Sequence, residues 1–140
     1  MNRLLMFLTL VFAAGCADSD PVLEVSDAWI REAPPGMPMS AGFLKLTNNG
    51  TEAAVLVGAT SESHDLVEIH VTRLEDGVAR MRQLDSITVG AGETAVFEPG
   101  GRHLMLMKPR GPLKAGDEVR MQLQLRSGET VPVEFIVRKR

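Results

Sequence analysis

Apolar and polar residues alternate with a period of two along several short stretches of the chain. The clearest is VRMQLQLR, residues 119–126, in which Val119, Met121, Leu123 and Leu125 are separated by charged or polar residues. Successive side chains of a strand point to opposite faces, so this pattern predicts a strand with one face toward a core.

Further strand-like stretches follow one another along the chain, with Gly, Pro, Asn, Asp and Ser between them. They cover residues 22–31, 40–48, 53–61, 65–74, 78–84, 86–89, 94–99, 103–107, 119–126 and 130–138. No stretch has a sustained helical period with caps. Many short, evenly spaced strands predict an all-β domain, an antiparallel β-sandwich or partly open barrel over residues 22–140. Trp29 is expected to anchor its core.

Asp76-Gly77 separates two of these stretches and predicts a tight hairpin. Asp-Gly is typical of a two-residue type I′ turn, and this turn places Glu75 opposite Val78. The turn therefore fixes the register of both strands.

His70 and Met81 fall on one face of this hairpin. In the predicted register His70 lies opposite Gln83, and Met81 is its diagonal neighbour. Diagonal pairs lie about 7–8 Å apart at Cα, so the imidazole and the thioether can converge. Glu68, two positions before His70 in the same predicted strand, lies on this face as well.

The stretch RHLMLMKPR, residues 102–110, carries two different stripes. Leu104 and Leu106 point to one face and predict core contact, whereas His103, Met105 and Met107 point to the other. His103 and Met105 would lie about 6.6 Å apart along the strand.

The composition narrows the kind of site that these residues can form. The chain has 140 residues, enough for one domain, and a net charge of −3, which does not favour a nucleic-acid partner. It has three histidines and eight methionines, but Cys16 is its only cysteine.

The first 16 residues, MNRLLMFLTLVFAAGC, have the layout of a secretory signal, with Arg3 before a short apolar run. Their end resembles a bacterial lipoprotein cleavage box. The resemblance implies a signal peptide over residues 1–15, lipid on the sulfur of Cys16, and a tether over residues 16–21. The alternative is ordinary signal-peptidase cleavage near Ala17. We expect a periplasmic, membrane-anchored lipoprotein, or in the alternative a soluble periplasmic or secreted protein.

A domain without a thiol must bind a soft metal through histidine and methionine. His70, Met81, His103 and Met105 would supply two imidazoles and two thioethers, a donor set that favours Cu(I) over harder divalent cations. A blue-copper centre would need a thiolate. There is no Ser/His/Asp set, no cysteine nucleophile and no carboxylate-rich zinc site, so we expect no enzymatic activity.

The spacing of these four residues resembles that of the PCuAC-type periplasmic copper chaperones. Ten residues separate His70 from Met81, twenty-one separate Met81 from His103, and His103-Leu104-Met105 completes the signature. The resemblance extends to DAWIREAPPG (27–36), AGFLKLTNNG (41–50) and LKAGDEV (113–119). Val71 stands where the family often has methionine.

The resemblance implies a cupredoxin-like, Greek-key-type β-sandwich that binds Cu(I) through His70, Met81, His103 and Met105. It also implies copper delivery toward the copper centre of cytochrome c oxidase, to an oxidase subunit or a Sco-type chaperone. A monomer is expected. The alternatives are a copper-storage or tolerance protein and a structural β-sandwich lipoprotein.

Four other residues are weaker candidates for metal binding. Met107 is expected to pack at the rim or in the core, and Met37 and Met39 to lie in a proline-rich loop as auxiliary ligands or exposed apolar residues. His64 is expected to be a solvated loop residue.

Overall fold

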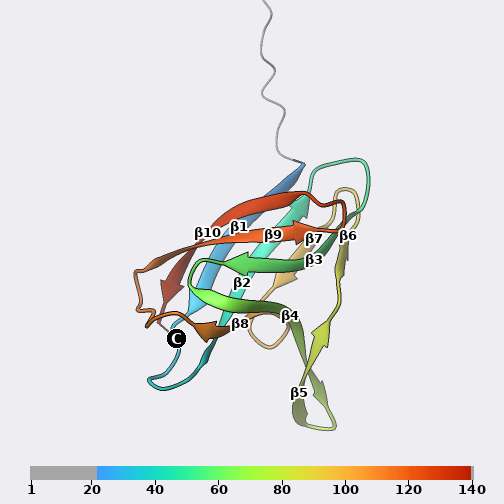
Figure 1. Cartoon of the computed structure of the whole chain (residues 1–140). Helices are drawn as coiled ribbons and strands as arrows, with labels where there is room; N and C mark the ends of the chain where they lie inside the picture. Colours follow the sequence, from blue (N-terminus) through green and yellow to red (C-terminus); the bar gives the residue numbers. More distant parts are fainter. Residues whose placement is uncertain (1–21, 140) are drawn as a thin grey trace, which may run out of the picture.

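Ten β-strands make up the fold of this chain in a computed structural model that describes residues 22–139 (Figure 1). The strands are β1 (Leu23–Arg31), β2 (Met39–Asn48), β3 (Ala54–Ser61), β4 (His64–Glu75), β5 (Val78–Leu84), β6 (Ile87–Val89), β7 (Thr94–Phe97), β8 (Arg102–Pro109), β9 (Glu118–Leu125) and β10 (Thr130–Arg138). The predicted signal peptide (residues 1–15), the tether (residues 16–21) and Cys16 lie outside the described residues. Within residues 22–139, no helix is long and apolar enough to cross a membrane.

The strands form one continuous ladder in the order β5-β4-β8-β2-β1-β10-β9-β3-β6, and β7 pairs with β2. Strand β2 is shared, since residues 39–42 pair with β8 and residues 44–47 pair with β7. All these pairs are antiparallel except β1 with β10, which are parallel. The predicted all-β fold is confirmed.

A single hydrophobic core lies between the strands. On β9 the four predicted residues Val119, Met121, Leu123 and Leu125 are all buried. On β8 the core side chains are Leu104 and Leu106, so both alternation patterns were interpreted correctly.

The β4–β5 hairpin extends away from this core (Figure 1). Every residue of β5 is exposed except Leu84, which is half-buried. Asp76 and Gly77 both have positive φ values, 52° and 76°, as a type I′ turn requires. The hairpin is therefore held by its turn and by its ladder to β4 rather than by burial.

A β-bulge in β1 changes which face its side chains occupy. The register with β2 shifts between Ser26 and Trp29, around Asp27, whose φ is 51°. Aspartate tolerates this left-handed conformation better than most residues, and the Asp27 carboxylate also accepts an ion pair from Lys45 at 2.7 Å. One extra residue reverses the alternation, because the side-chain period of a strand is two.

Trp29 consequently points away from the core, and its predicted role as a core anchor is wrong. Its ring packs against that of Phe43 on the outer face of the sheet, with 4.6 Å between the centroids and 40° between the ring planes. Neither ring belongs to the main core cluster. The two aromatic rings instead form a smaller cluster beside β8.

Candidate metal centre

The pairing of β4 with β8 places His70 directly opposite His103. The ring centroids are 5.8 Å apart and the ring planes meet at 53°. The core faces of these two strands carry leucine, isoleucine and valine, so both imidazoles lie on the outer face. His103 is nevertheless buried, because the Phe43 ring lies 6.5 Å from it on the neighbouring strand.

The hairpin brings Met81 toward the same place. Its register matches the prediction, with His70 opposite Gln83, Glu75 opposite Val78 and Met81 opposite Thr72. Met81 is therefore the diagonal neighbour of His70. Its side chain is 52% exposed, which leaves the thioether open to solvent and to other molecules.

Met105 occupies the next row of this face. It lies between Glu68 of β4 and Ala41 of β2, its two cross-strand partners. Only 8% of Met105 is exposed. The four predicted ligands thus lie on one face of three adjacent strands, β5, β4 and β8.

Each histidine keeps one ring nitrogen free of protein hydrogen bonds. His70 donates from Nε2 to the Glu68 carboxylate at 2.8 Å, and its buried Nδ1 has no partner. His103 donates from Nδ1 to the carbonyl of Gly101 at 3.1 Å, which leaves Nε2 as its free nitrogen. Ligating histidines commonly donate their other N–H in this way, which fixes the tautomer and the ring orientation.

The protonation state of His103 suits a ligand role. Burial lowers its pKa below the ordinary value, and the nearby charges of His70 and Arg31 act in the same direction, while the hydrogen bond to Gly101 opposes them. A neutral imidazole has a lone pair to offer, so this shift reduces proton competition for the nitrogen.

The weaker candidates occupy a neighbouring region. Met107 lies in the row beyond Met105, opposite both Met39 and Leu66. Met39 belongs to β2, not to the proline-rich loop where the sequence placed it, whereas Met37 is an exposed loop residue as expected.

His64 is not the solvated loop residue that the sequence predicted. It begins β4, only 2% of it is exposed, and its Nδ1 lies 2.8 Å from the Ser63 hydroxyl. With Met37 it lines a separate cavity of about 290 Å³. It lies six positions before His70 in the sequence, about 20 Å along an extended strand, so it lies apart from the four-ligand cluster.

Burial of His64 should make stability depend on pH. Burial lowers its pKa below 6.5, and the charge of Asp65 only partly opposes this shift. Between the two pKa values the unfolded chain binds more protons, so the free energy of unfolding falls as pH drops below about 6.5. We expect His64→Gln to flatten this decline in urea denaturation at several pH values. An unchanged slope would contradict the assignment. Some slope should remain in the variant, because the pKa of His103 is shifted in the same direction.

Harder metal sites are absent from the described part of the chain. Residues 22–139 contain no group of three or more His, Cys, Asp or Glu side chains that could hold a metal ion. The donor set at the β4–β8 face therefore depends on its thioethers.

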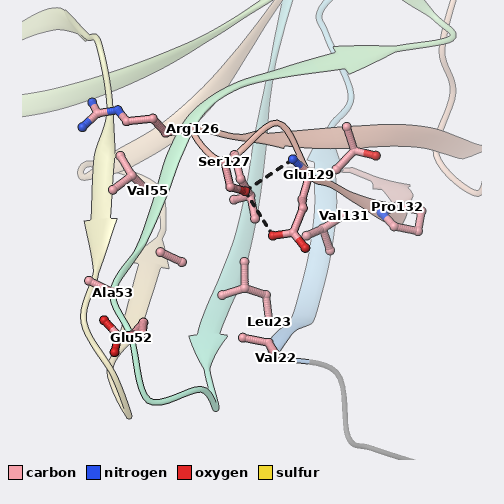
Figure 2. Close-up of a pocket in the computed structure, with 13 residues that line it drawn as sticks. Val22, Leu23, Glu52, Ala53, Val55, Arg126, Ser127, Glu129, Val131 and Pro132 are labelled. Atoms are coloured by element: carbon pink, nitrogen blue, oxygen red, sulfur yellow. Dashed lines mark hydrogen bonds between the residues drawn. The ribbon is translucent and has the colours of Figure 1, made fainter.

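A larger cavity lies elsewhere and contains no soft ligand (Figure 2). It measures about 700 Å³ and is lined by apolar residues including Leu23, Val55 and Val131. The turn between β9 and β10 closes one side, where Ser127 and Glu129 bond to each other. The cavity lies beside the start of β1, at the end of the molecule away from the β4–β5 hairpin.

Comparison with known proteins identifies the family. Residues 23–137 match the family described as "Putative lipoprotein LpqE-like". The chain belongs to this LpqE-like family. It is 37% identical over 117 residues to the putative lipoprotein Lxx21020 of Leifsonia xyli, covering 83% of this chain and 69% of the relative. It is also 38% identical over 80 residues to the uncharacterized protein RP573 of Rickettsia prowazekii, covering 56% and 44%.

Solved structures match the fold of this LpqE-like chain. The copper-bound PCuAC domain from PmoF2 aligns with a TM-score of 0.72 at 18% identity, covering 86% of this chain and 95% of the other. CuI-DR1885 from Deinococcus radiodurans aligns with a TM-score of 0.69 at 30% identity, covering 87% and 81%. The expected cupredoxin-like fold is confirmed.

The aromatic and charged side chains that flank the candidate metal centre were not predicted from the sequence. Trp29, Phe43 and Arg31 flank it from β1 and β2, yet Trp29 was assigned to the core and the other two were not singled out. The only signal was the imperfect alternation of VLEVSDAWIR, which the bulge at Asp27 explains.

Proposed function

We propose that this protein is an extracytoplasmic Cu(I) carrier that binds the ion through His70, Met81, His103 and Met105. One observation carries the proposal: His70 and His103 face each other, each with a ring nitrogen that no protein group bonds. Two thioethers share their face, and sulfur with imidazole is a donor set suited to Cu(I). The 30% identity to CuI-DR1885, whose name includes the ion, supports this reading.

The exposure of the ligands suggests how copper is passed on. His103 and Met105 are buried and fixed, whereas Met81 lies on a hairpin that projects from the body. A partner can therefore replace the Met81 thioether first and take the ion by successive ligand exchange. The resemblance to PCuAC chaperones favours a cytochrome c oxidase subunit or a Sco-type protein as the recipient. Copper storage or tolerance would use the same site without that transfer.

Membrane anchoring through lipid on Cys16 belongs to the same proposal. The family and one relative are described as lipoproteins, which supports it. Residues 16–21 would tether the domain in the periplasm. Figure 1 shows β1 beginning at the end of the molecule remote from the β4–β5 hairpin, so the hairpin that carries Met81 is far from the point where the tether would join the domain.

Anaerobic titration against a chromophoric Cu(I) chelator tests the proposal directly. We expect one Cu(I) per chain, with X-ray absorption showing two nitrogen and two sulfur scatterers. Three sulfurs would add Met107 or one of Met37 and Met39 to the set. Absence of competition, or equal melting temperatures with and without Cu(I), would favour a structural lipoprotein, since a ligand that binds only the folded state must stabilise it.

Glu68 should support binding through His70. We expect Glu68→Gln to lower Cu(I) affinity about tenfold, because partners that orient ligating histidines typically contribute about 10–100-fold. Glu75→Gln is the matched control, since Glu75 lies on the same hairpin and pairs with Arg80 and Arg82 instead. Equal affinities for Glu68→Gln and the unsubstituted protein in the chelator competition would rule out this role.

A further inference from the structure

Arg31 places an uncompensated positive charge beside the candidate metal centre. Its guanidinium carbon lies 5.3 Å from the centre of the Phe43 ring and 6.0 Å from that of Trp29. Its Nε is buried without a hydrogen-bond partner, and no carboxylate of residues 22–139 forms an ion pair with it.

The strand register brings this charge next to the ligands. Ile30 pairs with Gly42, so Arg31 falls beside Ala41, and Ala41 pairs with Met105. The bulge at Asp27 is what turns Arg31 to this outer face. Arg31 and Met105 are thus separated in the ladder by one strand, on which Ala41 occupies the same row.

The distances also limit how far the charge lies from His103. The Phe43 ring is 5.3 Å from the guanidinium carbon and 6.5 Å from the His103 ring, so the two groups are at most about 12 Å apart.

We propose that Arg31 makes the site selective for monovalent over divalent copper. The inference rests on the proposed Cu(I) function and adds its charge selectivity. The four ligands are neutral, so the fixed charges around them decide how the site discriminates between Cu(I) and Cu(II). Glu68, bonded to His70, favours the divalent ion, and Arg31 across the same row opposes it.

The expected size of the effect follows from Coulomb's law. At about 12 Å and an effective dielectric constant of about 20, a unit charge changes the binding of one additional charge about tenfold. A shorter separation gives a larger factor. Removal of the Arg31 charge should therefore raise the ratio of Cu(II) to Cu(I) affinity about tenfold.

The test compares Arg31→Gln with Arg31→Lys in the whole protein. Cu(I) and Cu(II) affinities are measured separately by chelator competition, and only Cu(II) binding that His103→Ala abolishes is counted. We expect Arg31→Gln to raise the Cu(II)/Cu(I) affinity ratio about tenfold and Arg31→Lys to leave it within about threefold. Arg82→Gln, which removes an exposed charge held by Glu75, should also leave the ratio within about threefold.

Three results would overturn the inference. An unchanged ratio in Arg31→Gln means that the charge does not act on the site. Equal increases in Arg31→Gln and Arg31→Lys mean that lost stacking on Trp29 and Phe43 is the cause. If the unsubstituted protein binds no Cu(I), the proposed function fails as well, so the two failures are distinguishable.

Discussion

Replacement of His103 by alanine is expected to lower the affinity for Cu(I) at least about 100-fold. Loss of a ligand should exceed the loss of a group that merely orients one, which is about 10–100-fold. His103 is buried on the outer face with its Nε2 free, and no other histidine of residues 22–139 can replace it opposite His70. Anaerobic competition with a chromophoric chelator measures the change.

Two further variants make this result interpretable. Met105→Leu removes the sulfur at nearly constant volume, so it should fold normally and still bind Cu(I) at least about tenfold more weakly. His64→Gln removes a histidine outside the cluster and should leave affinity within about threefold. Wild-type affinity in both His103→Ala and Met105→Leu would contradict the ligand assignment.

Leu104→Ala should produce the largest loss of stability among the substitutions considered for β8. Leu104 is fully buried in the main core, between the two proposed ligands in sequence but on the opposite face. Truncation of such a leucine typically costs about 2–5 kcal/mol, from lost burial and the cavity that remains. Urea denaturation of the metal-free protein at neutral pH measures it.

Leu66→Ala is the matched control for this substitution. Leu66 belongs to β4 on the outer face and is 37% exposed. Its truncation should cost less than that of Leu104, because a partly exposed side chain buries less area and leaves no enclosed cavity. Similar losses in the free energy of unfolding for both variants would mean that leucines on the two faces of the sheet contribute equally to stability, contrary to the expectation.

The hairpin half of the site could be predicted from the sequence because its determinants are local. Asp76-Gly77 permits the positive φ values of a type I′ turn, and a two-residue turn fixes every pair from Glu75–Val78 to Ile69–Leu84. The alternation of residues on β8 likewise assigned Leu104 and His103 to opposite faces of the strand. Neither the turn nor the alternation predicts that β4 pairs with β8, because this pairing joins segments that are distant in the sequence. Only the residue spacing shared with the PCuAC chaperones indicated that His70 and His103 come together.

The errors also have physical causes. Trp29 was assigned to the core because alternation was extended through Asp27, where the bulge reverses it. His64 was assigned to a loop because Ser63 and Asp65 resemble turn residues, yet pairing with Pro109 of β8 begins the strand there. Met39 pairs with Met107 in the same way. For His64 and Met39 a partner strand far away in the sequence outweighed local preference.

The parallel pair of β1 and β10 has a consequence for how the domain assembles. Trp29 pairs with Ile136, so the strand that carries Trp29 and Arg31 gains its second neighbour only from the far end of the sequence. Contacts of such large separation are formed slowly and depend on the rest of the chain being in place. The side of the candidate site that β1 forms is therefore completed only when β10 has paired with it. A chain truncated before β10 contains all four proposed ligands but lacks the strand that supports this side of the site.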